Sequence, residues 1–340
     1  MNQTMLSPRS ALVAAIVAVS LASIHVGAQS STSSTSSTGP GAPKPAAKSA
    51  KAWTMPRTPD GQPDLTGNWT NATYTPLERP ATLGNKEFYT KEEAAEVAKE
   101  RIAQFNSQAA DDIHYDNAIW QAETYDKGLS SLRTSLVIDP PDGRIPALTD
   151  EARRRAPPPQ AGSPDRRTDS YESRTLAERC ITWGNDGPPL MPVGYNANLD
   201  ILQGPGYVVV RTEMVHVARL IPIDAARLHV GPGIRQWNGD SRGHWEGTTL
   251  VVDTTNFNDQ IRFRNSTRSL HVVERFTRTD ATTINYTFTV DDPATWVRPW
   301  TAEVPLMKMQ APIFEYACHE GNYGLANILH AARVEEKATE

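Results

Sequence analysis

Residues 234–257, IRQWNGDSRGHWEGTTLVVDTTNF, constrain the fold of this chain more than any other stretch, because no helical period fits them. Turn-forming residues occupy 239–243, between arms that carry Trp237 and Trp245, and Glu246 and Gly247 suit a second reversal. Residues 250–252 are apolar and mostly β-branched, as the interior of a sheet requires. The stretch predicts a β-hairpin followed by a long strand.

The same order of strand, turn and strand continues along the chain. Apolar, β-branched runs predict strands at residues 199–203, 207–223, 270–278, 283–290, 296–307 and 312–318, the second interrupted near Glu213. Residues 135–145 predict a hairpin with Asp142 and Gly143 at its turn. Strands at this spacing indicate a mostly β fold, an antiparallel barrel or sandwich.

Three stretches follow a helical pattern instead. Residues 90–108 begin with Thr90 and Glu93 at the spacing of a capping box, and a modest apolar stripe follows. Residues 149–156 predict a short helix that ends before three prolines, and residues 325–336 predict a terminal helix. We expect all three at the periphery of the sheet.

The N-terminal residues predict export. Residues 1–28 combine a positive charge at Arg9, an apolar run short for a membrane span, and a small-residue cleavage site, as a signal peptide does. An uncleaved membrane anchor is the alternative. Residues 29–52 are rich in Ser, Thr, Pro and Ala and predict a disordered linker, which leaves residues 53–340 as a single β-rich domain. We expect a periplasmic or secreted protein without stable membrane insertion after the signal is cleaved.

Charge and motifs argue against several classes of partner. The formal net charge of -5 leaves no basic patch, so nucleic acid is not an expected partner. The chain has no dinucleotide fingerprint, P-loop or c-type haem motif, and no cofactor is expected. Ser241, His244 and Asp253 can be written as a catalytic triad, but the GxSxG elbow and the α/β alternation that present such a serine are missing.

The two cysteines, Cys180 and Cys318, predict a disulfide, because an exported chain meets an oxidising compartment and no third thiol competes. Both lie beside turn residues, where two sulfur atoms can approach each other. Two unrelated buried thiols are one alternative. A nucleophilic thiol is the other, and the oxidising compartment disfavours it.

Three blocks carry a resemblance that covers nearly all of the mature chain. PDLTGNW, NGDSRGHWEGTTLVVDTTNF and FEYACHEGNYGLANIL resemble blocks in a large set of exported bacterial proteins of unknown function. Gly67-x-Trp69 is similar to the entry motif of lipocalin and calycin barrels, where the tryptophan plugs one end. The resemblance implies a signal peptide and an antiparallel, lipocalin-like barrel or sandwich with a few peripheral helices. It implies no activity, because no reaction is assigned to that set.

Strand alternation places three ionisable side chains among apolar ones. His216, Glu274 and Arg298 each share a predicted strand face with apolar neighbours, and a charge buried there needs a partner or a role. As a catalytic set they would serve as base, acid and anion holder. In lipocalin-like barrels, an arginine from a late strand packs across the GxW tryptophan. By that alternative Arg298 covers Trp69 with Glu274 as its partner, and His216 is a core histidine bonded to a carbonyl.

Aromatic residues on the same faces suggest a ligand pocket. Trp296, Trp300 and Tyr286 would line it within the barrel. His319 and Asn322 follow the last predicted strand, where loop polar groups gather, and are further ligand-binding candidates. The alternative for Asn322 is a cap of the terminal helix. HExxH and CxxC spacings are missing from the sequence, and no metal site is expected.

The sequence as a whole favours an exported protein that binds a small apolar or amphipathic molecule in a Trp-lined β-barrel pocket. The first alternative is a cofactor-independent periplasmic isomerase, lyase or hydrolase that uses the same pocket. The second is an envelope scaffold protein with a filled core. The sequence leaves open the ligand, the presence of catalysis, the oligomeric state and which face of the sheet points inward.

Overall fold

The structure is a computed structural model that describes residues 53–106, 131–155, 168–184, 186–193, 196–224, 228–260 and 263–339. All of them belong to one compact unit, Ala52–Glu340. The expected signal peptide and linker lie outside the described residues. No helix in the described ranges has the length and apolar character needed to cross a membrane.

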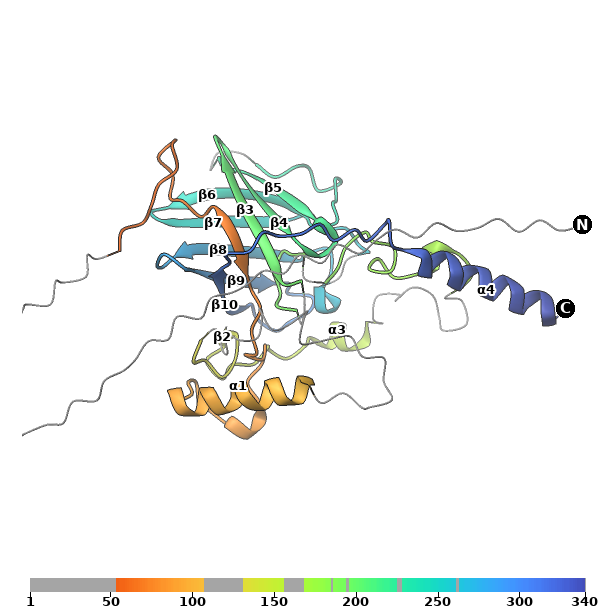
Figure 1. Cartoon of the computed structure of the whole chain (residues 1–340), viewed down its shortest axis with the longest axis horizontal. Helices are drawn as coiled ribbons and strands as arrows, with labels where there is room; N and C mark the ends of the chain where they lie inside the picture. Colours follow the sequence, from red (N-terminus) through yellow and green to blue (C-terminus); the bar gives the residue numbers. More distant parts are fainter. Residues whose placement is uncertain are drawn as a thin grey trace, which may run out of the picture. The chain divides into compact units, whose positions relative to one another are not determined.

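The described residues form one antiparallel sheet that curves into a nearly closed barrel (Figure 1). Its strands follow the order β5-β4-β3-β1-β10-β9-β8-β7-β6, and a further strand, β2, pairs with β10. The strands are β1 (Gly67–Thr70), β2 (Val137–Asp139), β3 (Asn198–Gly204), β4 (Tyr207–Thr212), β5 (Ala218–Pro222), β6 (Asp240–Glu246), β7 (Thr249–Thr255), β8 (His271–Arg278), β9 (Thr283–Asp291) and β10 (Trp300–Lys308). The prediction of a mostly β, antiparallel barrel with few helices is confirmed.

A glycine lets the two end strands of the barrel meet. Ile223, at the end of β5, pairs with Gly243 of β6 in a parallel bridge. A Cβ atom on Gly243 would lie 2.5 Å from Ile223 Cδ1 and 2.9 Å from Ile221 Cγ2, so only glycine fits this approach. The predicted turn at residues 239–243 is therefore wrong, since most of it is strand β6. The predicted reversal at Glu246 and Gly247 is confirmed and joins β6 to β7.

The predicted interruption near Glu213 is also confirmed, and it changes which side chains face inward. Between β4 and β5, residues Met214–His216 form a 3-10 turn in which Val215 has a left-handed φ of 57°. After this turn Arg219 and Ile221 are buried and Leu220 is exposed. Unbroken alternation from β4 predicts the opposite faces.

The helices lie close to their predicted bounds. Helix α1 (Lys91–Asn106) has the expected capping box, in which the Glu93 N–H donates to Thr90 Oγ1 at 3.2 Å and the Thr90 N–H to Glu93 Oε2 at 2.8 Å. Helices α3 (Asp150–Arg154) and α4 (Tyr323–Thr339) fall at the other two predicted places. Residues 312–318 form no strand, and residues 135–145 form no hairpin, because β2 pairs with β10 instead.

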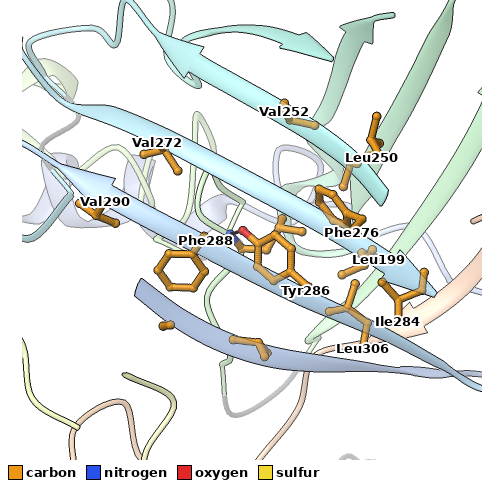
Figure 2. Packing of buried hydrophobic residues seen from close by; sticks show 14 of the residues in the cluster. Leu199, Leu250, Val252, Val272, Phe276, Ile284, Tyr286, Phe288, Val290 and Leu306 are labelled. Carbon is orange, nitrogen blue, oxygen red and sulfur yellow. Dashed lines mark hydrogen bonds between the residues drawn. The ribbon is translucent and has the colours of Figure 1, made fainter. Parts of the chain in front are cut away.

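Large aromatic side chains fill the barrel interior, and Figure 2 shows their packing. Phe276 and Phe288 lie on either side of Tyr286, with ring centroids 4.7 Å and 5.7 Å from its ring. Trp69 of the GxW motif is fully buried, and the guanidinium of Arg278 lies 5.4 Å from its ring. A cation therefore covers this tryptophan, as the lipocalin alternative implied, but the residue is Arg278.

The predicted disulfide between Cys180 and Cys318 is present, with a Cα–Cα distance of 5.8 Å. It joins residues 168–184 to the segment that leads into α4. Such a bridge is typical of proteins that fold outside the reducing cytoplasm.

Candidate functional site

The most deeply buried polar groups form a cluster inside the barrel. Glu274 of β8 is fully buried and accepts two hydrogen bonds from Arg219 of β5, one of them to Oε1 at 2.9 Å. The Tyr286 hydroxyl also donates to Glu274 Oε1 at 2.9 Å and accepts the Leu190 N–H at 2.9 Å. Burial, together with the Glu274 carboxylate, raises the pKa of the Tyr286 phenol well above its usual range. Glu274 and Arg219 thus form a buried ion pair, in which Arg219 Nε has no hydrogen-bond partner among the described residues.

The predicted catalytic set does not assemble around this cluster. Glu274 points inward as predicted, but it lines neither of the cavities described below. Arg298 is half exposed and donates to Asp139 at 2.6 Å, so its predicted inward placement is wrong. It precedes β10, where the predicted strand alternation does not yet apply. His216 lies in the turn between β4 and β5, and its side chain is outside the described part of the structure.

The predicted aromatic lining belongs to the core. Trp296, Trp300 and Tyr286 have exposed fractions of 3%, 0% and 0%. They do not line a described cavity, because neighbouring aromatic rings occupy the barrel interior. Trp300 does reach the end of the barrel, where its ring stacks on Phe263 at 6.2 Å. One face of Phe263 thus packs on the core, and the residue also lines a cleft.

This cleft lies at the barrel end where β6, β8 and β10 begin, and we call it the aromatic cleft. Its volume is about 360 Å³. Residues of three loops line it: 182–184, 187–189 and 191 before β3, 237–238 before β6, and 257, 263–264 and 270 between β7 and β8. The rings that line it are Trp183, Trp237, Phe257 and Phe263.

Hydrogen bonds hold the first of these loops at both ends. Asp186 accepts the Trp183 N–H at 2.8 Å and the Thr182 hydroxyl at 2.5 Å. At the other end, the Leu190 N–H donates to Tyr286 inside the barrel. Burial raises the pKa of Asp186 to about 6, although the bonds from Thr182 and Trp183 act in the opposite direction. The wall of the cleft is therefore fixed in the absence of a ligand.

A second cavity, of about 600 Å³, surrounds the disulfide. Asn322 lines it, donates to the Glu178 carbonyl at 2.7 Å, and caps α4 by accepting the Leu325 N–H at 3.3 Å. The capping alternative is thus confirmed, and the residue also reaches a cavity. His319 is exposed and is not part of the cavity wall.

Two histidines and two aspartates form a chain of contacts that the sequence reasoning missed, and we call it the histidine–aspartate array. His229 Nδ1 lies 2.8 Å from Asp240 Oδ2, and His229 Nε2 lies 2.8 Å from Asp253 Oδ1. His271 Nε2 lies 2.7 Å from Asp253 Oδ2. The antiparallel register of β6, β7 and β8 brings the beginning of β6 and β8 beside the end of β7. No spacing in the sequence predicts this arrangement, and the predicted turn at 239–243 placed Asp240 outside any strand.

The array places two imidazole rings against two carboxylates, whose oxygens accept hydrogen bonds when ionised. Burial alone would raise the pKa of Asp253, but hydrogen bonds and charge from His271 and His229 outweigh it and lower that pKa. The hydrogen bond to Asp253 raises the pKa of His271. Among the described residues no His, Cys, Asp and Glu side chains form a group that suits a metal ion.

The array also fixes the loop that leads to the cleft. The Val230 N–H donates to Asp240 Oδ2 at 3.0 Å, and Asn256 Nδ2 donates to the Val230 carbonyl at 2.9 Å. Farther along, the Gln236 N–H donates to the Asn256 carbonyl at 3.1 Å, next to Trp237. The segment that supplies Trp237 is therefore attached to β6 and β7 at two points.

Fold and site together define an antiparallel β-barrel protein with a filled interior and an aromatic cleft at one end. No family model, curated protein or solved structure matches this chain.

Proposed function

We propose that this chain is an exported protein whose aromatic cleft binds a small apolar or amphipathic molecule. The observation that carries the proposal is the cleft itself: a volume of about 360 Å³ lined by Trp183, Trp237, Phe257 and Phe263. Ligand sites of drug-sized molecules begin at about 300 Å³ and are mostly apolar with a few polar groups. The ligand sits at the end of the barrel, because side chains fill the interior.

The fixed walls of the cleft favour binding over collapse. Asp186 and Tyr286 hold the loop of residues 182–191, and the bond between Gln236 and Asn256 holds the backbone beside Trp237. A site ordered in advance loses less conformational entropy when the ligand arrives. An enzyme that uses Glu274 with Arg298 has less support, because these side chains share no described cavity.

The export half of the proposal rests on the predicted signal peptide and on the disulfide. A bridge between Cys180 and Cys318 persists in the periplasm or outside the cell. The resemblance to exported bacterial proteins with lipocalin-like domains points in the same direction. Fractionation of cells that express the full chain, with N-terminal sequencing of the product, tests export and cleavage after residue 28.

Isothermal titration calorimetry of the mature protein with decanoate, geraniol and 2-naphthol tests binding. We expect at least one Kd below about 100 μM, which corresponds to about -5.5 kcal/mol. Trp237→Ala should weaken binding by about tenfold or more, because an aromatic wall supplies most of the buried apolar contact. Trp53→Ala is the matched control, since Trp53 is 40% exposed and lies outside the cleft. Equal binding by Trp237→Ala and wild type, or no binding of any compound, would contradict the proposal.

A further inference from the structure

We infer that the aromatic cleft selects an anion, and that its ligand is a small aromatic carboxylate held through Arg264. The inference rests on the proposed function, because it names the chemical class that the same cleft accepts. Four features carry it: the charge of the lining, the unpaired guanidinium of Arg264, the hydrogen-bond donors that lack partners, and the shape of the lining.

Among the described residues that line the cleft, Arg264 is the only ionisable side chain, and none is an aspartate, a glutamate or a lysine. The described lining therefore carries one positive charge. Apolar walls lower the local dielectric constant and strengthen the interaction of that charge with an anion. A cationic ligand would meet repulsion at the same place.

The guanidinium of Arg264 has no hydrogen bond or ion pair within the described part of the chain, in contrast to its neighbours. Arg235 donates to the Phe257 carbonyl at 3.0 Å, and Arg268 pairs with Asp259 at 2.8 Å. Arg264 itself lies in the turn Phe263–Asn265 with a left-handed φ of 49°. A bond of 3.0 Å from the Ser266 N–H to the Phe263 carbonyl closes this turn. A non-glycine residue in this conformation is uncommon, and here it presents the side chain at the cleft.

The other polar groups of the lining that lack partners are mainly donors. The indole N–H groups of Trp183 and Trp237 make no hydrogen bond with described residues, and neither does the Asn238 amide. The Thr182 hydroxyl already donates to Asp186. An arginine fork matches the two oxygens of a carboxylate, and nearby N–H donors supply further bonds to the same group.

The shape of the lining indicates that the rest of the ligand is flat and apolar. Four aromatic rings surround a volume of about 360 Å³, which favours a flat, apolar body attached to the acidic group. Planar rings stack on tryptophan and phenylalanine in offset or edge-to-face geometry with little loss of conformational entropy. An aromatic carboxylate with one or two rings meets both requirements.

The test compares three molecules of one shape and different charge. Calorimetry at low salt measures the binding of 2-naphthoate, 2-naphthamide and 2-naphthylmethylammonium to the mature protein. We expect the carboxylate to bind about tenfold more tightly than the amide, and the cation most weakly, because charge-assisted hydrogen bonds are about twice as strong as neutral ones. Higher salt should reduce the preference, since the guanidinium is exposed.

Two variants locate the preference. Arg264→Gln should bind the carboxylate and the amide equally, while Arg264→Lys should keep part of the preference. Arg154→Gln is the matched control, because Arg154 is an exposed arginine with no ion pair in the described structure and lies away from the cleft. Circular dichroism checks that the variants fold.

The outcomes separate this inference from the proposed function. Equal binding of the three molecules by wild type, or a preference that persists in Arg264→Gln, would overturn the ligand class. Binding that still depends on Trp237 would leave the proposed function standing in that case. A failure of all three molecules and of decanoate, geraniol and 2-naphthol to bind would overturn both.

Discussion

At the scale of single residues, the buried pair of Glu274 and Arg219 is the most consequential interaction in the barrel. Both side chains are removed from water, at exposed fractions of 0% and 5%. A buried ion pair gains little over an apolar pair of the same shape, but removal of one member leaves an uncompensated charge. The Tyr286 hydroxyl donates to Glu274 and accepts the Leu190 N–H. This chain of hydrogen bonds connects the buried ion pair to the loop that lines the aromatic cleft.

Glu274→Gln should therefore destabilise the protein strongly. The variant keeps the shape of the side chain and removes its charge, which leaves the Arg219 guanidinium buried without a counter-ion. We expect a loss of about 3–5 kcal/mol in the free energy of unfolding, the usual cost of breaking a buried pair. Urea denaturation followed by circular dichroism measures it.

Arg298→Gln provides the control for this experiment. Arg298 and Asp139 form an ion pair at the surface, with exposed fractions of 49% and 53%, and exposed pairs contribute about 0–1 kcal/mol.

The double variant Arg219→Met/Glu274→Leu should recover most of the lost stability, because it removes both charges. A Glu274→Gln variant that loses less than about 1 kcal/mol would show that the carboxylate is not paired as described.

At the scale of elements, the three helices and most strands were predictable from the sequence, but the faces that the strands present after an irregularity were not. Alternating β-branched runs located β3, β4, β8 and β9 to within a residue or two, because packing on a sheet requires that pattern. The turn around the left-handed residue Val215 reversed the faces after β4, so that Arg219 points into the barrel and Leu220, which unbroken alternation places inside, is exposed. Gly243 was assigned to a turn because glycines commonly occur there. In the structure it allows the close approach of Ile223, a contact that local sequence does not show.

The candidate site shows the same division. Cys180 with Cys318 and the helix cap at Asn322 depend on residue type and neighbours, and both were predictable. The histidine–aspartate array and the aromatic cleft combine loops that only the barrel register brings together. No spacing in the chain carries that information.

The array should make stability depend on pH. The pKa of Asp253 is lowered from 3.8, so its contribution is present above pH 3.8 and is lost as the pH falls through the folded-state value. The pKa of His271 is raised from 6.5, so its contribution is present below pH 6.5 and is lost as the pH rises through the folded-state value. Asp291 also faces His271 and acts in the same direction. The array should therefore stabilise the fold most between pH 3.8 and 6.5.

Asp253→Asn tests this window. The amide replaces one of the two carboxylate oxygens, each of which contacts a different histidine, with an NH2 group and carries no charge, so we expect a loss of about 1 kcal/mol at pH 5 that shrinks toward pH 9. The midpoint of urea unfolding, measured from pH 3 to pH 9, gives the difference at each pH. Asp259→Asn is the control, since Asp259 pairs with Arg268 at the surface. A difference between Asp253→Asn and wild type that is constant across the range would rule out the array as its source.

At the scale of the whole molecule, the disulfide connects two parts that the sheet does not hold together. Cys180 lies in the coil before β3, and Cys318 lies in the coil between β10 and α4. Hydrogen bonds attach α4 and its cap to the same segment: Arg333 donates to the Asp169 carbonyl at 3.0 Å, and Asn322 donates to the Glu178 carbonyl at 2.7 Å. Both partners belong to the segment that Cys180 anchors. The bridge therefore joins the two parts of a peripheral unit, residues 168–184 and α4, beside a barrel that has its own core.

Removal of the bridge should consequently release this unit before the barrel unfolds. The cysteines are 138 residues apart, and the entropic model assigns about 5 kcal/mol to a loop of that length. If α4 detaches while the barrel stays closed, hydrogen exchange at pH 7 should show lost protection in α4 and retained protection in β8 and β9 of the Cys180→Ala/Cys318→Ala variant. Wild type with the bridge intact is the reference, and wild type treated with dithiothreitol should reproduce the variant. A uniform loss of protection across β8, β9 and α4 would show instead that the bridge stabilises the fold as one cooperative unit.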